Sequence, residues 1–228
     1  MTSPQTASSS TQDFDLADWA SRNGRNVAIG AGILVVLGGG FWLYTTSAQR
    51  KESFAAQELM QARNSAESGN MPLAASDLSK LIDRFGGTRA ADEAAILLNQ
   101  IRLVQGQRDV AVNALQQFVR ERHPDDVLAS AYGLLGAALE DQGKRKEAGD
   151  AYRQASDKAR LDFLKASSLL DAGRAYATAG DSADAKAAFT DVLKRFARLD
   201  QAAEARVRLS ELGGTVPPPP PAEDSTQL

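Results

Sequence analysis

Residues 131–155, AYGLLGAALEDQGKRKEAGDAYRQA, decide the fold of this chain, because they spell out two helices separated by a single glycine. Small or apolar residues recur at spacings of three and four on both sides of Gly143, as in amphipathic helices. Gly143 can take the left-handed backbone conformation that ends one helix and turns the chain into the next. The stretch therefore predicts a helical hairpin, in which Gly136 and Ala148 mark the close approach of the two helices.

The same hairpin recurs with a constant period. Its turn glycine is found every 37 residues, at Gly69, Gly106, Gly143 and Gly180. Five residues after each glycine comes an alanine, and nine residues after it comes a larger apolar or aromatic side chain: Leu78, Leu115, Tyr152 or Phe189. Self-similarity at a fixed period of this size is the signature of a repeat array. The sequence thus predicts an all-α solenoid of about four hairpins.

The hairpin at 131–155 resembles the tetratricopeptide repeat, whose pattern of large, Leu-Gly, aromatic and Ala positions it matches at Tyr132, Leu135, Gly136, Leu139, Ala148, Tyr152 and Ala155. Only Leu139 departs from that pattern, since it replaces an aromatic residue. The resemblance covers a predicted repeat domain at 50–212. Residues 201–212 match half a unit and are expected to form a helix that caps the last hairpin.

Composition restricts the function. The chain of 228 residues has a net charge of −3, no cysteine and one histidine, His123. Without a basic stripe, this balance argues against a nucleic-acid partner. The sequence shows no phosphate-binding loop, catalytic triad or metal-ligand spacing, and His123 reads as a turn residue. We therefore expect no catalytic residues, no metal site, no cofactor, no small-molecule substrate and no enzymatic activity.

An uncharged stretch of 24 residues lies between Arg25 and Arg50. Its apolar part predicts a transmembrane helix at 27–46, because about 20 helical residues cross the hydrocarbon core of a bilayer. A cleaved signal peptide is the alternative, with a small-residue site at 46–48. The apolar stretch is longer than the usual 7 to 15 residues of such a peptide, which favours an uncleaved anchor. The numbers of Arg and Lys on its two sides do not decide the orientation.

The segments outside these elements carry weaker signals. Residues 1–12 are rich in Ser, Thr and Gln and are expected to be a disordered tail. Residues 13–26 read as a short membrane-proximal segment. Residues 213–228 form a proline-rich tail with five consecutive prolines, which predicts an extended, disordered spacer. A ligand for an aromatic groove is the other reading of this tail.

Stacked hairpins of this kind curve, so that their first helices line a concave surface suited to a polypeptide partner. When the groove positions of the repeat family are transferred one by one to this sequence, they predict a protein-binding surface of mixed charge. The alternative is that these residues merely face solvent on a scaffold. The predicted residues are Arg63, Glu67, Ile96, Gln100, Ala137, Glu140, Asp141, Leu170 and Arg174.

The whole layout also resembles the ancillary SecYEG translocon subunit family of bacterial inner-membrane proteins. The resemblance rests on Trp19, on the Asn-Gly pair at 23–24, on the aromatic end of the apolar stretch at 41–44, and on the repeats that follow. It implies a single-pass inner-membrane protein with a periplasmic repeat domain that contacts the secretion channel, periplasmic chaperones or client polypeptides. A scaffold that joins components of an envelope or cell-wall assembly complex is the alternative function.

Overall fold

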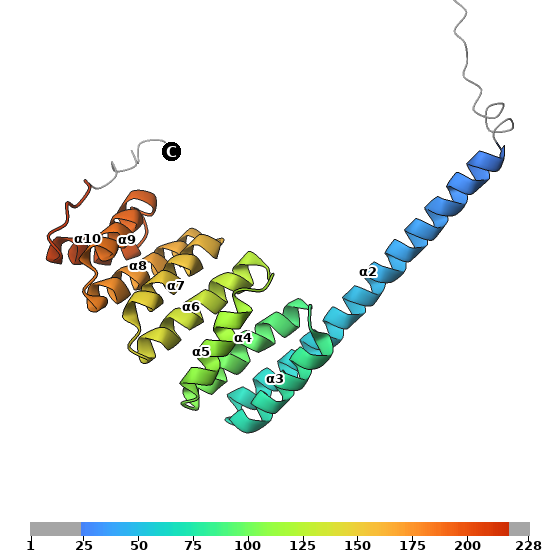
Figure 1. Cartoon of the computed structure of the whole chain (residues 1–228), viewed down its shortest axis with the longest axis horizontal. Helices are drawn as coiled ribbons and strands as arrows, with labels where there is room; N and C mark the ends of the chain where they lie inside the picture. The colour runs from blue at the N-terminus through green and yellow to red at the C-terminus, as the bar shows by residue number, and fades with distance from the viewer. Residues whose placement is uncertain (1–23, 219–228) are drawn as a thin grey trace, which may run out of the picture. The chain divides into compact units, whose positions relative to one another are not determined.

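The computed structural model describes residues 24–218, and all regular secondary structure within them is α-helical (Figure 1). The expected all-α solenoid with a capping helix and a long apolar N-terminal helix is confirmed. The helices are α2 (Gly24–Glu67), α3 (Met71–Phe85), α4 (Arg89–Val104), α5 (Arg108–Phe118), α6 (Asp125–Asp141), α7 (Arg145–Lys158), α8 (Asp162–Ala179), α9 (Ser182–Arg195) and α10 (Gln201–Glu211).

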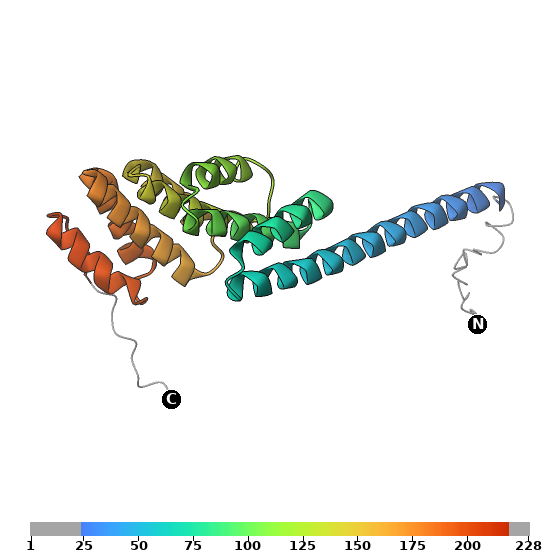
Figure 2. The same ribbon diagram turned by 90° about the horizontal axis from the view of Figure 1, so that it is seen from below.

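Four hairpins follow one another along the chain (Figure 2). The end of α2 pairs with α3, and the next three hairpins are α4 with α5, α6 with α7, and α8 with α9. Helix α10 packs on α8 and α9, as expected for a terminal cap. The turn glycines all have a positive φ, at 84° for Gly69, 76° for Gly106, 76° for Gly143 and 81° for Gly180. Glycine recurs at this position because side chains with a Cβ are strained there.

Helix α2 contains both the apolar stretch and the first arm of the first hairpin. The helix predicted at 27–46 continues without a break to Glu67. The chain divides into two compact units at Arg50, so α2 contributes to each. The helix is long and apolar enough to cross a membrane, a property that a signal sequence shares.

The helix ends follow local sequence signals. Thr88 caps α4, with its hydroxyl oxygen accepting a hydrogen bond from the Ala91 backbone N–H at 3.2 Å. Pro72 lies in the first turn of α3, where the missing amide donor costs little. Helix α10 ends at Glu211, shortly before Gly213 with a φ of 68°. The predictions for residues 1–12, for most of 13–26 and for the end of the tail lie outside the described residues.

Aromatic rings pack directly onto glycines of the preceding helix. A Cβ added to Gly173 would lie 2.4 Å from the nearest ring atom of Phe189, far inside van der Waals contact. The two other contacts of this kind leave 2.6 Å, so each glycine is required by the ring that covers it. The pairs are Gly136 with Tyr152, Gly149 with Tyr176 and Gly173 with Phe189.

Two hydrophobic cores fill the solenoid, and the division between them falls inside the second hairpin. One core combines α2, α3 and α4, whereas α5 belongs to the other, which extends to α10. The second hairpin lacks the glycine–aromatic contact. Asn99 occupies the position that Gly136 has in the third hairpin, 37 residues later, and Leu115 occupies the position of Tyr152. Asn99 is buried, and its side-chain amide donates to the Ala95 carbonyl oxygen at 2.9 Å.

His123 lies in the turn between α5 and α6, as the sequence predicted, and its ring contacts Phe118 and Asp92. Its ring stacks on Phe118 with centroids 3.8 Å apart, and Nδ1 lies 3.0 Å from an Asp92 carboxylate oxygen on α4. Burial raises the pKa of Asp92, although the contact with His123 acts in the opposite direction. Among the described residues, no group of three or more His, Asp or Glu side chains is placed to hold a metal ion.

Candidate protein-binding groove

The first helices of the four hairpins line a hollow of about 590 Å³. Its walls come from α2, α4 and α6, with Leu164 contributed by α8. Four of the nine predicted groove residues meet here, although they come from two hairpins: Arg63, Glu67, Ile96 and Gln100. The concave surface expected from the repeat pattern therefore exists as a hollow at this part of the array.

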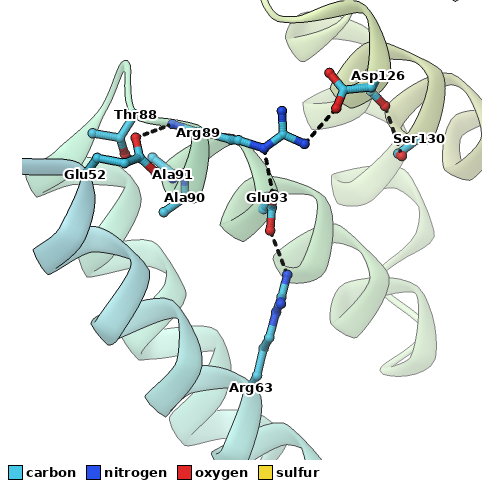
Figure 3. Close-up of polar contacts among 9 residues, drawn as sticks. All are labelled: Glu52, Arg63, Thr88, Arg89, Ala90, Ala91, Glu93, Asp126 and Ser130. Carbon is cyan, nitrogen blue, oxygen red and sulfur yellow. Dashed lines mark hydrogen bonds and ion pairs between the residues drawn. The ribbon is translucent and has the colours of Figure 1, made fainter. Parts of the chain in front are cut away.

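A ladder of charges crosses the repeats beside this hollow (Figure 3). The Glu52 carboxylate accepts hydrogen bonds from the backbone N–H groups of Arg89 and Ala90, both at 2.9 Å, and so caps α4 from another helix. The Arg89 guanidinium then donates to Asp126 at 2.7 Å, and this bond lowers the pKa of Asp126. Glu52, Arg89 and Asp126 are each 37 residues apart, so one position of the repeat forms the ladder.

Glu93 joins the ladder to the predicted groove residue Arg63. Its carboxylate accepts from Arg89 at 3.2 Å and from Arg63 at 2.8 Å (Figure 3). These side chains are partly exposed, so each pair contributes at most about 1 kcal/mol to stability. Their main effect is on what the hollow offers to a ligand. The charges of Arg63, Arg89, Glu93 and Asp126 are paired with one another within the protein.

Glu52→Ala is expected to lower the free energy of unfolding by about 0.5–2 kcal/mol, since two N–H groups at the start of α4 lose their acceptor. Chemical unfolding of the full-length chain in detergent, followed by circular dichroism, measures the change. Glu67→Ala is the matched control on the same helix, because the Glu67 side chain has no hydrogen bond or ion pair within residues 24–218. It should shift stability by less than about 0.5 kcal/mol. Equal losses in both variants would contradict the capping role of Glu52.

A second hollow of about 420 Å³ adjoins the first and shares Asp126, Ser130 and Leu164 with it. It is more apolar, and its rim carries Leu161 and Leu164, which are 55% and 43% exposed. The groove positions carried over from the repeat family do not include these leucines, because they lie at the start of α8. The signal in the sequence was the presence of three large apolar residues, Leu161, Phe163 and Leu164, within four positions.

The other predicted residues lie outside both hollows. Ala137 and Asp141 are exposed on α6. The Glu140 carboxylate accepts a hydrogen bond from the Tyr152 hydroxyl at 2.8 Å, and burial followed by this bond raises the pKa of Tyr152. Arg174 pairs with Asp171 and with Glu204 of α10. Glu140 and Arg174 thus connect neighbouring helices.

The placement of Leu170 on the groove surface was wrong. Leu170 is only 6% exposed and belongs to the larger hydrophobic core. Ile96, which occupies the same position of the repeat two units earlier, is also partly buried. This position lies at the edge of the core, where an apolar side chain turns inward because burial removes it from water.

The chain was compared with curated protein sequences, solved structures and family models. No curated protein sequence matches the chain. A tetratricopeptide repeat protein from Parabacteroides merdae has a similar crystal structure, with a TM-score of 0.54 and 13% identity over 70% of this chain and 60% of that one. The MamA protein aligns with a TM-score of 0.49 and 20% identity, over 70% of this chain and 86% of that one. The chain therefore spans less than two thirds of the Parabacteroides protein, and the likeness shows the fold alone. The family model of the tetratricopeptide repeat-like domain matches residues 17–214, and the chain belongs to this family.

Proposed function

We propose that this protein is a membrane-anchored binding protein whose concave groove holds segments of other polypeptides. Tetratricopeptide repeat domains bind other proteins and typically act as interaction scaffolds rather than enzymes. The observation that carries the proposal is the pair of adjoining hollows, which combines internally paired charges with the exposed leucines Leu161 and Leu164. A surface of this kind offers apolar contact to many polypeptide segments, and four of its charged side chains are already paired with one another.

The finer part of the proposal concerns location. We place α2 in a bacterial inner membrane and the repeats on the periplasmic side, next to the secretion channel. The support is the apolar length of α2 and the resemblance of the layout to ancillary translocon subunits. Polypeptides that leave the channel are still unfolded and expose apolar and charged side chains together, which matches the mixed lining of the groove. Chaperones that receive such chains are partners of the same kind.

The test is photocrosslinking in living cells, with a photoreactive amino acid at one position of the full-length chain. Gln100 is exposed and lines the larger hollow, whereas Asn113 is exposed on the second helix of the same hairpin and outside the hollows. We expect crosslinks from Gln100 to many secreted proteins or to channel components, and few from Asn113. Indistinguishable patterns from the two positions would overturn the proposal, and a single saturable partner would favour the envelope scaffold.

The same cells supply the control for location. The chain has no cysteine, so Ser182→Cys, exposed at the start of α9, gives one site for a membrane-impermeant maleimide. Labelling in intact spheroplasts is expected if the repeats are periplasmic. Labelling only after lysis would contradict the periplasmic placement and leave the crosslinks to be explained by a cytoplasmic partner.

A further inference from the structure

Two charged side chains of the groove have no partner within residues 24–218. Across both hollows, the charged lining residues are three basic and three acidic. Arg63, Arg89, Glu93 and Asp126 form ion pairs with one another. The remaining two, Glu67 and Arg160, have no hydrogen bond or ion pair to any described residue. The groove thus presents one free carboxylate and one free guanidinium to a ligand.

These two charges belong to different hollows, which meet at an exposed leucine. Glu67 lines only the larger hollow and Arg160 only the smaller one, while Leu164 lines both. Leu161 adds to the apolar surface in the smaller hollow. Side chains that already form ion pairs within the groove gain little from a charged ligand, because each one already has a partner of opposite charge. The unpaired Glu67 and Arg160 therefore select the charge of the ligand.

We propose that the groove takes a short unfolded segment with an apolar side chain at its centre, a basic group on one side and a carboxylate on the other. The apolar side chain lies against Leu161 and Leu164, the basic group faces Glu67 and the carboxylate faces Arg160. This inference rests on the proposed function and names the chemistry of its ligand. A groove of this kind differs from one that selects a purely acidic or a purely basic peptide.

The size of the hollows fits a segment and not a folded surface. Volumes of about 590 Å³ and 420 Å³ are those of clefts that take a few side chains each. Apolar contact in such clefts supplies most of the affinity, whereas exposed charges at the ends adjust it by a few fold. Binding is therefore expected to tolerate many sequences that share the same order of charge and apolar character.

The test uses four blocked peptides with a neutral dye, read by fluorescence anisotropy with the full-length chain in a nonionic detergent. Three share a Leu-Phe-Leu centre and differ in their flanks, which are Lys and Glu, Lys and Lys, or Glu and Glu. The fourth carries Lys and Glu around Ser-Ser-Ser. We expect the Lys and Glu peptide with the apolar centre to bind about two- to fivefold more tightly than the Lys and Lys peptide or the Glu and Glu peptide. This preference should disappear at 1 M salt, where the Debye length falls to about 3 Å.

Charge-reversal variants test the assignment of each end. Glu67→Lys should make the Glu and Glu peptide the preferred ligand, and Arg160→Glu should make the Lys and Lys peptide the preferred ligand. Both side chains are exposed and unpaired in the described part of the chain, so neither change should affect folding. An unchanged order of affinities in both variants would overturn the inference.

Leucine variants separate this inference from the proposed function. Leu164→Ser should weaken every apolar peptide at least about fivefold. Leu73→Ser, on an equally exposed leucine of α3 outside the groove, should leave binding unchanged. If no peptide binds, or if Leu164→Ser has no effect, the groove itself fails as a binding site. If Leu164→Ser weakens binding while the charge reversals leave the order intact, only the charge assignment fails.

Discussion

Gly173→Ala is expected to destabilise the protein by about 1–3 kcal/mol, although alanine is the better helix former by about 1 kcal/mol. The new Cβ would lie 2.4 Å from Phe189, whose side chain is completely buried and cannot move aside. The ring or the helix must therefore shift at the cost of packing. Chemical unfolding of the full-length chain in detergent, followed by circular dichroism at 222 nm, measures the loss.

Gly133→Ala is the matched control, because a Cβ at this helical glycine has nothing within 4 Å. It should stabilise the chain by up to about 1 kcal/mol. In a Phe189→Leu background, Gly173→Ala should lose most of its penalty, since the two residues are in direct contact. A gain in stability from Gly173→Ala in the wild-type background would show that the ring does not require the glycine.

Leu78→Ala is expected to cost about 2–5 kcal/mol, because the side chain is fully buried in the core of α2, α3 and α4. The effect should be local. Since α5 to α10 share a separate core, hydrogen exchange should accelerate in α3 and α4 while the amides of α7 to α9 keep their protection. Hydrogen-exchange mass spectrometry of the full-length chain resolves these segments.

Leu73→Ala, on the same helix, is the control for this result. Leu73 is 46% exposed and lies outside the core, so its removal should cost well under 1 kcal/mol and leave exchange in α4 unchanged. Faster exchange in α7 to α9 of the Leu78→Ala variant, as large as that in α4, would mean that the two cores unfold as one cooperative unit.

The repeat fold was predictable because one backbone requirement recurs. Each turn needs a residue with a positive φ, and glycine marks it every 37 residues, so the register of every hairpin could be read directly. The continuity of α2 also has a local cause in the sequence. Residues 45–51 contain neither Gly nor Pro, so nothing interrupts the helix where the apolar stretch ends.

The groove was predictable only in part. Arg63 and Gln100 occupy the same position of successive repeats and line one hollow, because equivalent residues of successive first helices face the same side. It could not tell that Leu170 turns into the core, since a register does not distinguish a surface from the edge of a core. The contribution of Leu161 and Leu164 depends on how α8 begins beside α6, which no periodicity encodes. The charge ladder had a readable signal, the 37-residue spacing of Glu52, Arg89 and Asp126.

The ladder also limits how such a gene can change by duplication or deletion. Its repeat position holds an acid, a base and an acid in turn, and the next residue in the series is Phe163. Deleting residues 89–125 would keep the period of 37 but bring Asp126 next to Glu52, so that two carboxylates would meet. Deleting 126–162 would place Phe163 opposite Arg89 and leave Glu93 as the one acid of the ladder that pairs with the guanidinium. The ladder therefore depends on the order of the repeats as well as on their period.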